Sequence, residues 1–187
     1  ADDPHHLGLS GRHGAGGDDV DLDLARPLAA QEFGNVYVVD SENICTGQGY
    51  LVLQAAKWAA DGLPPKNISM RLQGLAKRVE LSFVLNQLDY MAKSGRCSGV
   101  LAFGANILGL KPSLAAIDGE RKDVGKDIDR SMVFISSTQA KRGVMEAIKA
   151  GRRQYGNFEN VYETDIGTTI GGYSGPGTIG IVFARKQ

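Results

Sequence analysis

A glycine-rich segment near the C-terminus holds the residues whose types and spacing are best suited to chemistry. Residues 166–178 read IGTTIGGYSGPGT, in which glycines and one proline alternate with five hydroxyl-bearing side chains. Glycines let consecutive backbone N–H groups line a concave turn that can hold an anion. Tyr173, Ser174 and Thr178 place hydroxyl donors around Gly175. The segment therefore predicts an anion-binding turn, and a tight connection into a terminal strand would explain the same residues equally well.

A second polar group follows a short apolar run early in the chain. Residues 36–39 (VYVV) predict a strand, with Asp40 and Ser41 at its carboxyl end. Ligands gather at such strand ends in open α/β sheets. Residues 50–60 are apolar on nearly all sides and predict a helix packed between other elements. Capping of this helix by Asp40, Ser41 or Thr46 is the interpretation that we favour over ligand binding.

The middle of the chain contains an almost uncharged segment, residues 100–110, in which small residues separate bulky ones. Such spacing lets a backbone or a slender ligand come close. A short helix predicted at 88–93 precedes it, followed by Gly95, which suits a left-handed C-cap. A buried core helix is the simpler interpretation, and an apolar ligand slot is the alternative. The residues expected to line the slot are Leu101, Phe103, Ile107 and Leu108, together with Phe83 on a strand predicted at 81–85.

Composition and charge limit the functions that the chain can have. Among the 187 residues, Lys+Arg and Asp+Glu both number 21, so nothing favours nucleic-acid binding or attraction to a membrane surface. The 25 glycines favour an α/β chain over a helix bundle. No apolar run is long enough to cross a bilayer, and no export leader is visible. Cys45 and Cys97 are expected to be free thiols in a reducing cytoplasm.

Residues 1–27 differ from the rest of the chain, being rich in Gly, Asp and His without a sustained hydrophobic period. His5, His6 and His13 lie among aspartates, but their spacing fits no structural zinc pattern, so no metal site is expected. The segment predicts an atypical, poorly ordered leader.

The remaining pattern predicts three regions. Residues 1–27 would be the leader, 28–62 the remnant of a first α/β domain, and 63–187 a second α/β domain whose last turn and strand return towards the first. The break at 62–65 (GLPP) is the expected hinge. Further helices are expected at 67–79 and 139–153, strands at 113–117, 132–136, 161–164 and 179–184, and a hairpin turn at 118–119.

Four stretches in series resemble one family. They are VYVVDSENICTGQGYLVLQAA, FVLNQLDYMAKSGRC, ANILGLKPSL and IGTTIGGYSGPGTIGIVF. In this order and rough spacing they resemble the DegV family of bacterial fatty-acid-binding proteins, over most of residues 28–119 and 132–185. The resemblance implies a two-domain α/β architecture that holds one long-chain fatty acid between its domains, with a parallel-sheet first domain and a lipid-binding second domain.

The resemblance also implies a carrier rather than an enzyme. Such proteins present the acyl carboxylate to a fatty-acid kinase, which performs the phosphoryl transfer, and they need no cofactor. Hydroxyls of the first domain and a histidine at the Gly-Pro-Gly turn hold the carboxylate. Here Tyr173 stands at that turn position, so a phenol could donate instead. Arg96 matches the arginine of the family's Gly-Arg motif and would belong to the kinase-facing surface.

Two departures from the family leave alternatives open. The serine-bearing loops of the first domain are not intact in residues 1–27, and 120–130 is shorter than the usual insertion. A truncated carrier without function is therefore one alternative. An enzyme acting on a phosphorylated or nucleotide ligand is another, suggested by Gly47-Gln48-Gly49 before the helix. Val52 stands where a third glycine would belong, and no P-loop lysine is present.

Overall fold

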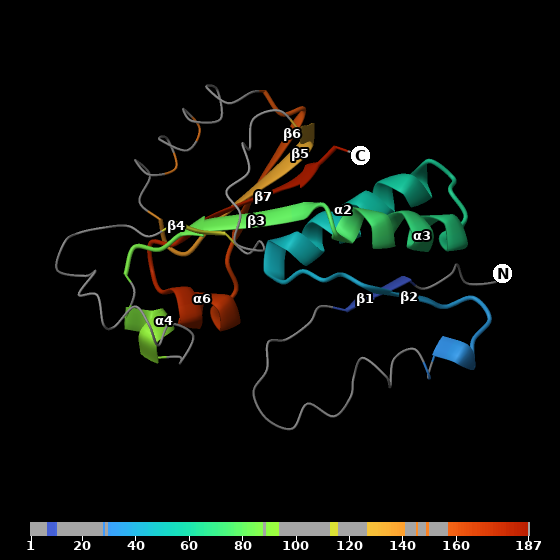
Figure 1. Cartoon of the computed structure of the whole chain (residues 1–187), viewed down its shortest axis with the longest axis horizontal. Coiled ribbons are helices and arrows are strands. Elements are labelled where there is room, and N and C mark those ends of the chain that lie inside the picture. Colours follow the sequence, from blue (N-terminus) through green and yellow to red (C-terminus); the bar gives the residue numbers. More distant parts are fainter. Residues whose placement is uncertain are drawn as a thin grey trace. The chain divides into compact units, whose positions relative to one another are not determined.

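The computed structural model describes residues 7–10, 28, 30–87, 89–93, 113–115, 127–140, 145, 149 and 157–186. The chain forms two compact units, Ala1–Val79 and Glu80–Gln187, each with its own packing. Figure 1 shows both, and together they give the mixed α/β class that the sequence predicts. The boundary differs from the expected break at 62–65, because the helices on either side of that break pack together within the first unit.

The first unit combines a two-stranded sheet with two helices. Strands β1 (Leu7–Ser10) and β2 (Tyr37–Asp40) pair in parallel (Figure 1). Helix α2 spans Cys45–Ala60, and α3 spans Pro65–Ala76. Part of the leader expected to be poorly ordered is therefore a strand, because β2 offers its backbone as a pairing partner. The buried core comprises Val39, Tyr50, Leu51, Ala55, Ile68, Leu72, Leu75 and Ala76.

Helix α2 begins five residues earlier than the apolar pattern indicates. Gly47 and Gly49 consequently lie inside the helix, and Gly47 is buried against Asn43. The N-cap residue is Ile44, which makes no side-chain capping hydrogen bond. A phosphate-binding loop must precede its helix, so a Gly-x-Gly sequence within α2 cannot serve as one.

The second unit is built on a five-stranded sheet in the order β4-β3-β7-β5-β6 (Figure 1). Its strands are β3 (Val79–Val84), β4 (Ser113–Ala115), β5 (Ile128–Ser137), β6 (Asn160–Asp165) and β7 (Ile179–Arg185). Strand β5 pairs with β6 in parallel and with β7 in the antiparallel direction, and β3 pairs with β4 in the antiparallel direction. The central strands are apolar because they are covered on both faces, with Met132, Val133, Ile135, Val182 and Phe183 buried.

Two side-chain contacts tie neighbouring strands together. The Arg185 guanidinium forms an ion pair with the buried carboxylate of Glu80, which joins β7 to β3 and raises the pKa of Arg185. Phe134 and Tyr162 stack with ring centroids 5.0 Å apart across β5 and β6. Within the described ranges, no helix is both long and apolar enough to cross a membrane.

Two short helices accompany the sheet. Helix α4 (Asp89–Lys93) and helix α6 (Thr168–Ser174) contact each other. The residue pattern did not indicate α6, since the segment was expected to be a turn throughout. In the helix expected at 139–153, four residues are described: Met145 and Lys149 are helical, whereas Gln139 and Ala140 are not, so the predicted start at 139 is wrong. The segment 100–110 and the hairpin turn at 118–119 lie outside the described residues.

Candidate functional site

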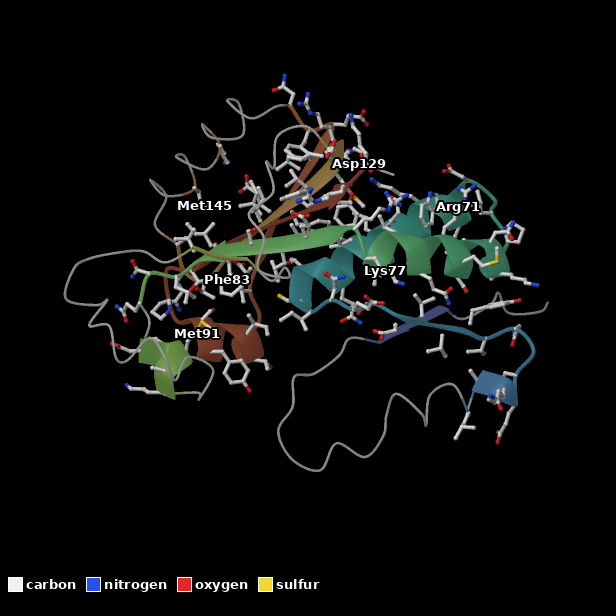
Figure 2. The ribbon with its side chains drawn as sticks, in the orientation of Figure 1. Arg71, Lys77, Phe83, Met91, Asp129 and Met145 are labelled. Atoms are coloured by element: carbon white, nitrogen blue, oxygen red, sulfur yellow. The ribbon has the colours of Figure 1, made fainter. Side chains whose placement is uncertain are left out.

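Half of the predicted site residues lie in the described part of the second unit. Tyr173 and Ser174 end helix α6, Gly175 is its C-cap, Thr178 precedes β7, and Phe83 lies half-buried on β3 (Figure 2). The others lie outside the described residues and stay predictions: Leu101, Phe103, Ile107 and Leu108 for the acyl tail, and Arg96 for the partner.

Helix α6 ends at a backbone conformation that only glycine adopts readily. Gly175 has φ +77° and ψ 171°, a region essentially closed to residues with a Cβ atom. Gly177 also has a positive φ, +80°. The chain therefore reverses sharply after Ser174 and enters β7 at Ile179. This reversal fixes the position of the hydroxyl groups on either side of it.

Thr138, just beyond β5, holds this turn through four hydrogen bonds. Its hydroxyl donates to the Gly175 carbonyl (2.5 Å) and accepts from the Thr178 N–H (3.0 Å). Its carbonyl accepts from the Gly177 N–H (2.5 Å), and its own N–H donates to the Thr178 carbonyl (2.9 Å). Sequence reasoning missed Thr138, because nothing local connects it with a turn almost 40 residues later; a polar residue at a strand's end was the only signal.

These bonds change the interpretation of the turn. The N–H groups of Gly175, Gly177 and Thr178 all have acceptors within the protein, and Pro176 has no N–H to offer. The prediction from the glycine pattern, that consecutive free amides form an anion nest, is therefore wrong at these positions. A ligand held here must be recognised by side-chain hydroxyls.

One hydroxyl at the turn remains available. The Thr178 hydroxyl donates to the Ser174 carbonyl (2.8 Å), so the protons of both threonine hydroxyls are committed. The Ser174 side chain is only 5% exposed, and its Oγ has no hydrogen-bond partner among the residues that the structure describes. A buried hydroxyl without a partner costs about 1–3 kcal/mol. Such a group in a folded protein calls for an explanation, and a bound ligand is one, so Ser174 is the candidate ligand donor.

The polar residues after β2 are arranged differently. The Ser41 hydroxyl donates to the Asn43 carbonyl (3.0 Å) and accepts from the Asn43 N–H (3.3 Å). The Asp40 carboxylate accepts from the Glu42 N–H (2.9 Å). The prediction that Asp40, Ser41 or Thr46 caps the next helix is wrong, because Asp40 and Ser41 bond to their own loop and Thr46 lies inside α2.

Metal ligands do not gather in the ranges that the structure describes: no three His, Cys, Asp or Glu side chains lie close enough together to hold an ion. The chemistry available at the turn is hydrogen-bond donation, chiefly from the Ser174 hydroxyl, within a mixed α/β protein. These features are suited to holding a hydrogen-bond acceptor.

Comparison with known proteins gives the family. Residues 25–134 match the family model described as "Uncharacterised protein, DegV family", which is more than half of the chain. The chain therefore belongs to the DegV family. A DegV domain-containing protein of Deinococcus radiodurans is 26% identical over 176 residues, an alignment covering 83% of this chain and 63% of the relative. The chain thus spans less than two thirds of that relative's length.

Solved structures of the family share the fold. A DegV family protein from Eubacterium eligens loaded with heptadecanoic acid matches with a TM-score of 0.78 at 18% identity, over 100% of this chain and 74% of the other. The Streptococcus pneumoniae Fatty Acid Kinase (Fak) B3 protein loaded with linoleic acid matches with a TM-score of 0.68 at 13% identity, over 87% and 65%. At these identities the similarity establishes the fold alone.

Proposed function

We propose that this chain binds a long-chain fatty acid and that the Ser174 hydroxyl donates a hydrogen bond to its carboxylate. The observation that carries the proposal is the buried, unpartnered Ser174 Oγ in a family whose solved members include fatty-acid complexes. The Tyr173 phenol, on the same half-buried helix end, is the second proposed donor. Gly175 and Thr178 shape the turn that presents both.

The energetics require both an apolar and a polar half of the site. Burying an acyl chain of ordinary length contributes on the order of 10 kcal/mol, at roughly 0.8 kcal/mol per methylene. An unpaired buried carboxylate would offset several kcal/mol of that gain. The Ser174 hydroxyl reduces this penalty, and the proposal assigns the tail to Phe83 and to Leu101, Phe103, Ile107 and Leu108.

The proposal extends to the partner. The match to a Fatty Acid Kinase (Fak) B3 protein supports a carrier that presents the acyl carboxylate to a fatty-acid kinase, which itself performs the phosphoryl transfer. We assign Arg96 to the kinase-facing surface on the family's Gly-Arg motif alone. Cys45 carries a free thiol, the form expected in a reducing compartment, and the proposal places the carrier in the cytoplasm.

The direct test is mass spectrometry of lipids extracted from the natively purified protein, followed by calorimetric titration of the delipidated protein with palmitate. We expect an extracted long-chain fatty acid and saturable palmitate binding that raises the melting temperature. ATP in place of palmitate is the control and should leave the melting temperature unchanged. No extractable acyl chain together with no palmitate response would remove the proposed function. Kinase turnover lost in Arg96→Glu, with palmitate binding intact, is the expected result for the partner surface.

A further inference from the structure

The Gly175–Gly177 turn lies against two side chains: that of Asn86, shortly after β3, and that of Tyr90, on α4. An added Cβ at Gly175 would lie 2.5 Å from Cδ2 of Tyr90 and 2.9 Å from its Cγ. An added Cβ at Gly177 would lie 3.0 Å from Cβ of Asn86. The backbone of Gly175 therefore lies against the Tyr90 ring, and the backbone of Gly177 lies against the Asn86 side chain. Glycine is required here twice, for the positive φ and for the space.

Neighbouring residues anchor the chain on both sides of Tyr90. Leu85, immediately before Asn86, is fully buried. Met91 is half-buried and lies on the side of α4 that faces α6 (Figure 2). Tyr90 itself is 38% exposed, so its ring is placed on Gly175 by its neighbours rather than by burial in the core. The atoms in contact are ring carbons, not the phenol oxygen.

We propose that Tyr90 is a positioning residue that sets the head-group selectivity of the site, an inference that rests on the proposed function. Thr138 holds the Gly175 carbonyl by a hydrogen bond, and the Tyr90 ring lies against Gly175 on the side where a Cβ would project. Ser174 directly precedes the residue restrained in this way. Its hydroxyl is therefore pre-oriented, which reduces the ordering cost of binding.

Pre-orientation acts on the head group and not on the tail. A fixed hydroxyl donor makes a charge-assisted hydrogen bond to a carboxylate, which is stronger than the bond it makes to a neutral alcohol. Releasing Gly175 should weaken that bond while the burial of methylenes continues unchanged. Tyr90 then determines how strongly the site prefers an acid over an alcohol of the same chain length.

The test compares palmitate with hexadecanol by competitive displacement of a fluorescent fatty acid from the full chain. Wild type should prefer palmitate. Tyr90→Ala should lower palmitate affinity about tenfold and leave hexadecanol affinity unchanged. Tyr90→Phe should behave as wild type, because the ring carbons make the contact. The matched control is Tyr162→Ala, which removes a ring stacked on Phe134 and should lower the melting temperature while keeping the acid-to-alcohol ratio.

An unchanged acid-to-alcohol ratio in a folded Tyr90→Ala protein that binds both probes would overturn this inference alone. An equal loss of the ratio in Tyr162→Ala would also overturn it, because the effect would then be general loosening. If Tyr90→Ala fails to fold, Tyr90→Leu replaces it, because leucine keeps apolar bulk without a flat ring. The preference for palmitate over hexadecanol should again fall. Wild type that binds no palmitate would remove the proposed function, and this inference with it.

Discussion

Two serines, one in each unit, are buried to nearly the same extent and are bonded in opposite ways. Ser41 follows β2 and has no exposed surface, while Ser174 ends α6 and is 5% exposed. The Ser41 hydroxyl both donates and accepts within its own loop, and the neighbouring Asn43 amide donates to the carbonyls of Ser41 (2.8 Å) and Ala76 (3.1 Å). The Ser174 hydroxyl has no partner within the described part of the chain.

The difference separates structural polar groups from a ligand-facing one. The loop after β2 is closed by side-chain bonds between residues two positions apart, with one further bond to the end of α3. At the Gly175–Gly177 turn, the Thr138 and Thr178 hydroxyls donate to backbone carbonyls, and the Thr138 hydroxyl also accepts from a backbone N–H. Neither hydroxyl has a proton left to donate to a ligand. Ser174 is left as the donor. Burial and residue type alone would not distinguish the two serines, whereas the hydrogen-bond count does.

The largest expected effect concerns the two glycines with positive φ at the ends of α2 and α6. Gly175→Ala should lower the free energy of unfolding by about 3 kcal/mol, because the new methyl group meets the Tyr90 ring and the backbone conformation is closed to alanine. Gly62 has φ +83° but no atom within 4 Å of an added Cβ. Gly62→Ala should therefore cost only about 1 kcal/mol. Urea unfolding of the ligand-free proteins measures both.

Equal losses for the two glycine variants would mean that the Tyr90 contact adds nothing to the cost at Gly175. In that case strain alone would account for both values, and the turn in the second unit would be no more tightly held than the end of α2.

The next expected effect tests the two serines directly. Ser174→Ala should weaken palmitate binding by about 2 kcal/mol, roughly 30-fold, since a hydrogen bond to a charged group is lost. The ligand-free protein should unfold no more easily than wild type, because the missing hydroxyl had no partner. Ser41→Ala should do the reverse, lowering the free energy of unfolding by about 2 kcal/mol and leaving palmitate affinity unchanged.

Calorimetric titration and urea unfolding on both variants decide this comparison. A Ser174→Ala protein that loses stability without losing affinity would show that the hydroxyl has a structural partner, and the carboxylate would need another donor.

Hydrophobic spacing predicted the elements whose stability comes from one apolar face. The helix expected at 67–79 is α3, whose Ile68, Leu72 and Leu75 are buried, although it ends at Ala76 and Val79 already begins β3. Helix α6 was missed because Thr168–Ser174 contains two glycines and three consecutive β-branched residues, a composition with low helix propensity. Its packing against Thr138 and α4 overrides that propensity, and such contacts are not visible in a local window.

The site was predicted in its residue types and not in its bonding. Glycines and hydroxyls at the turn indicated an anion site, and Ser174 was among the expected donors. That the amides would be taken by Thr138 depends on the pairing of β5 with β7, which the sequence pattern does not specify. The capping prediction for the loop after β2 was wrong for a related reason. The Asn43 side chain, and not that of an expected capping residue, bonds this loop to the end of α3.

The smallest expected effect concerns Thr164 Oγ1 on β6, which in the described ranges is the other buried hydroxyl without a partner. Thr164 lies opposite Ser136 in the sheet, on a strand that the Gly175 turn does not enter. Thr164→Val removes the hydroxyl at nearly constant volume, so the free energy of unfolding should rise by up to about 1 kcal/mol, and palmitate affinity should not change. Urea unfolding and titration on this variant therefore separate two causes. A loss of affinity equal to that of Ser174→Ala would show that lack of a partner marks ligand contact wherever it occurs, and that the glycine turn confers no special role on Ser174.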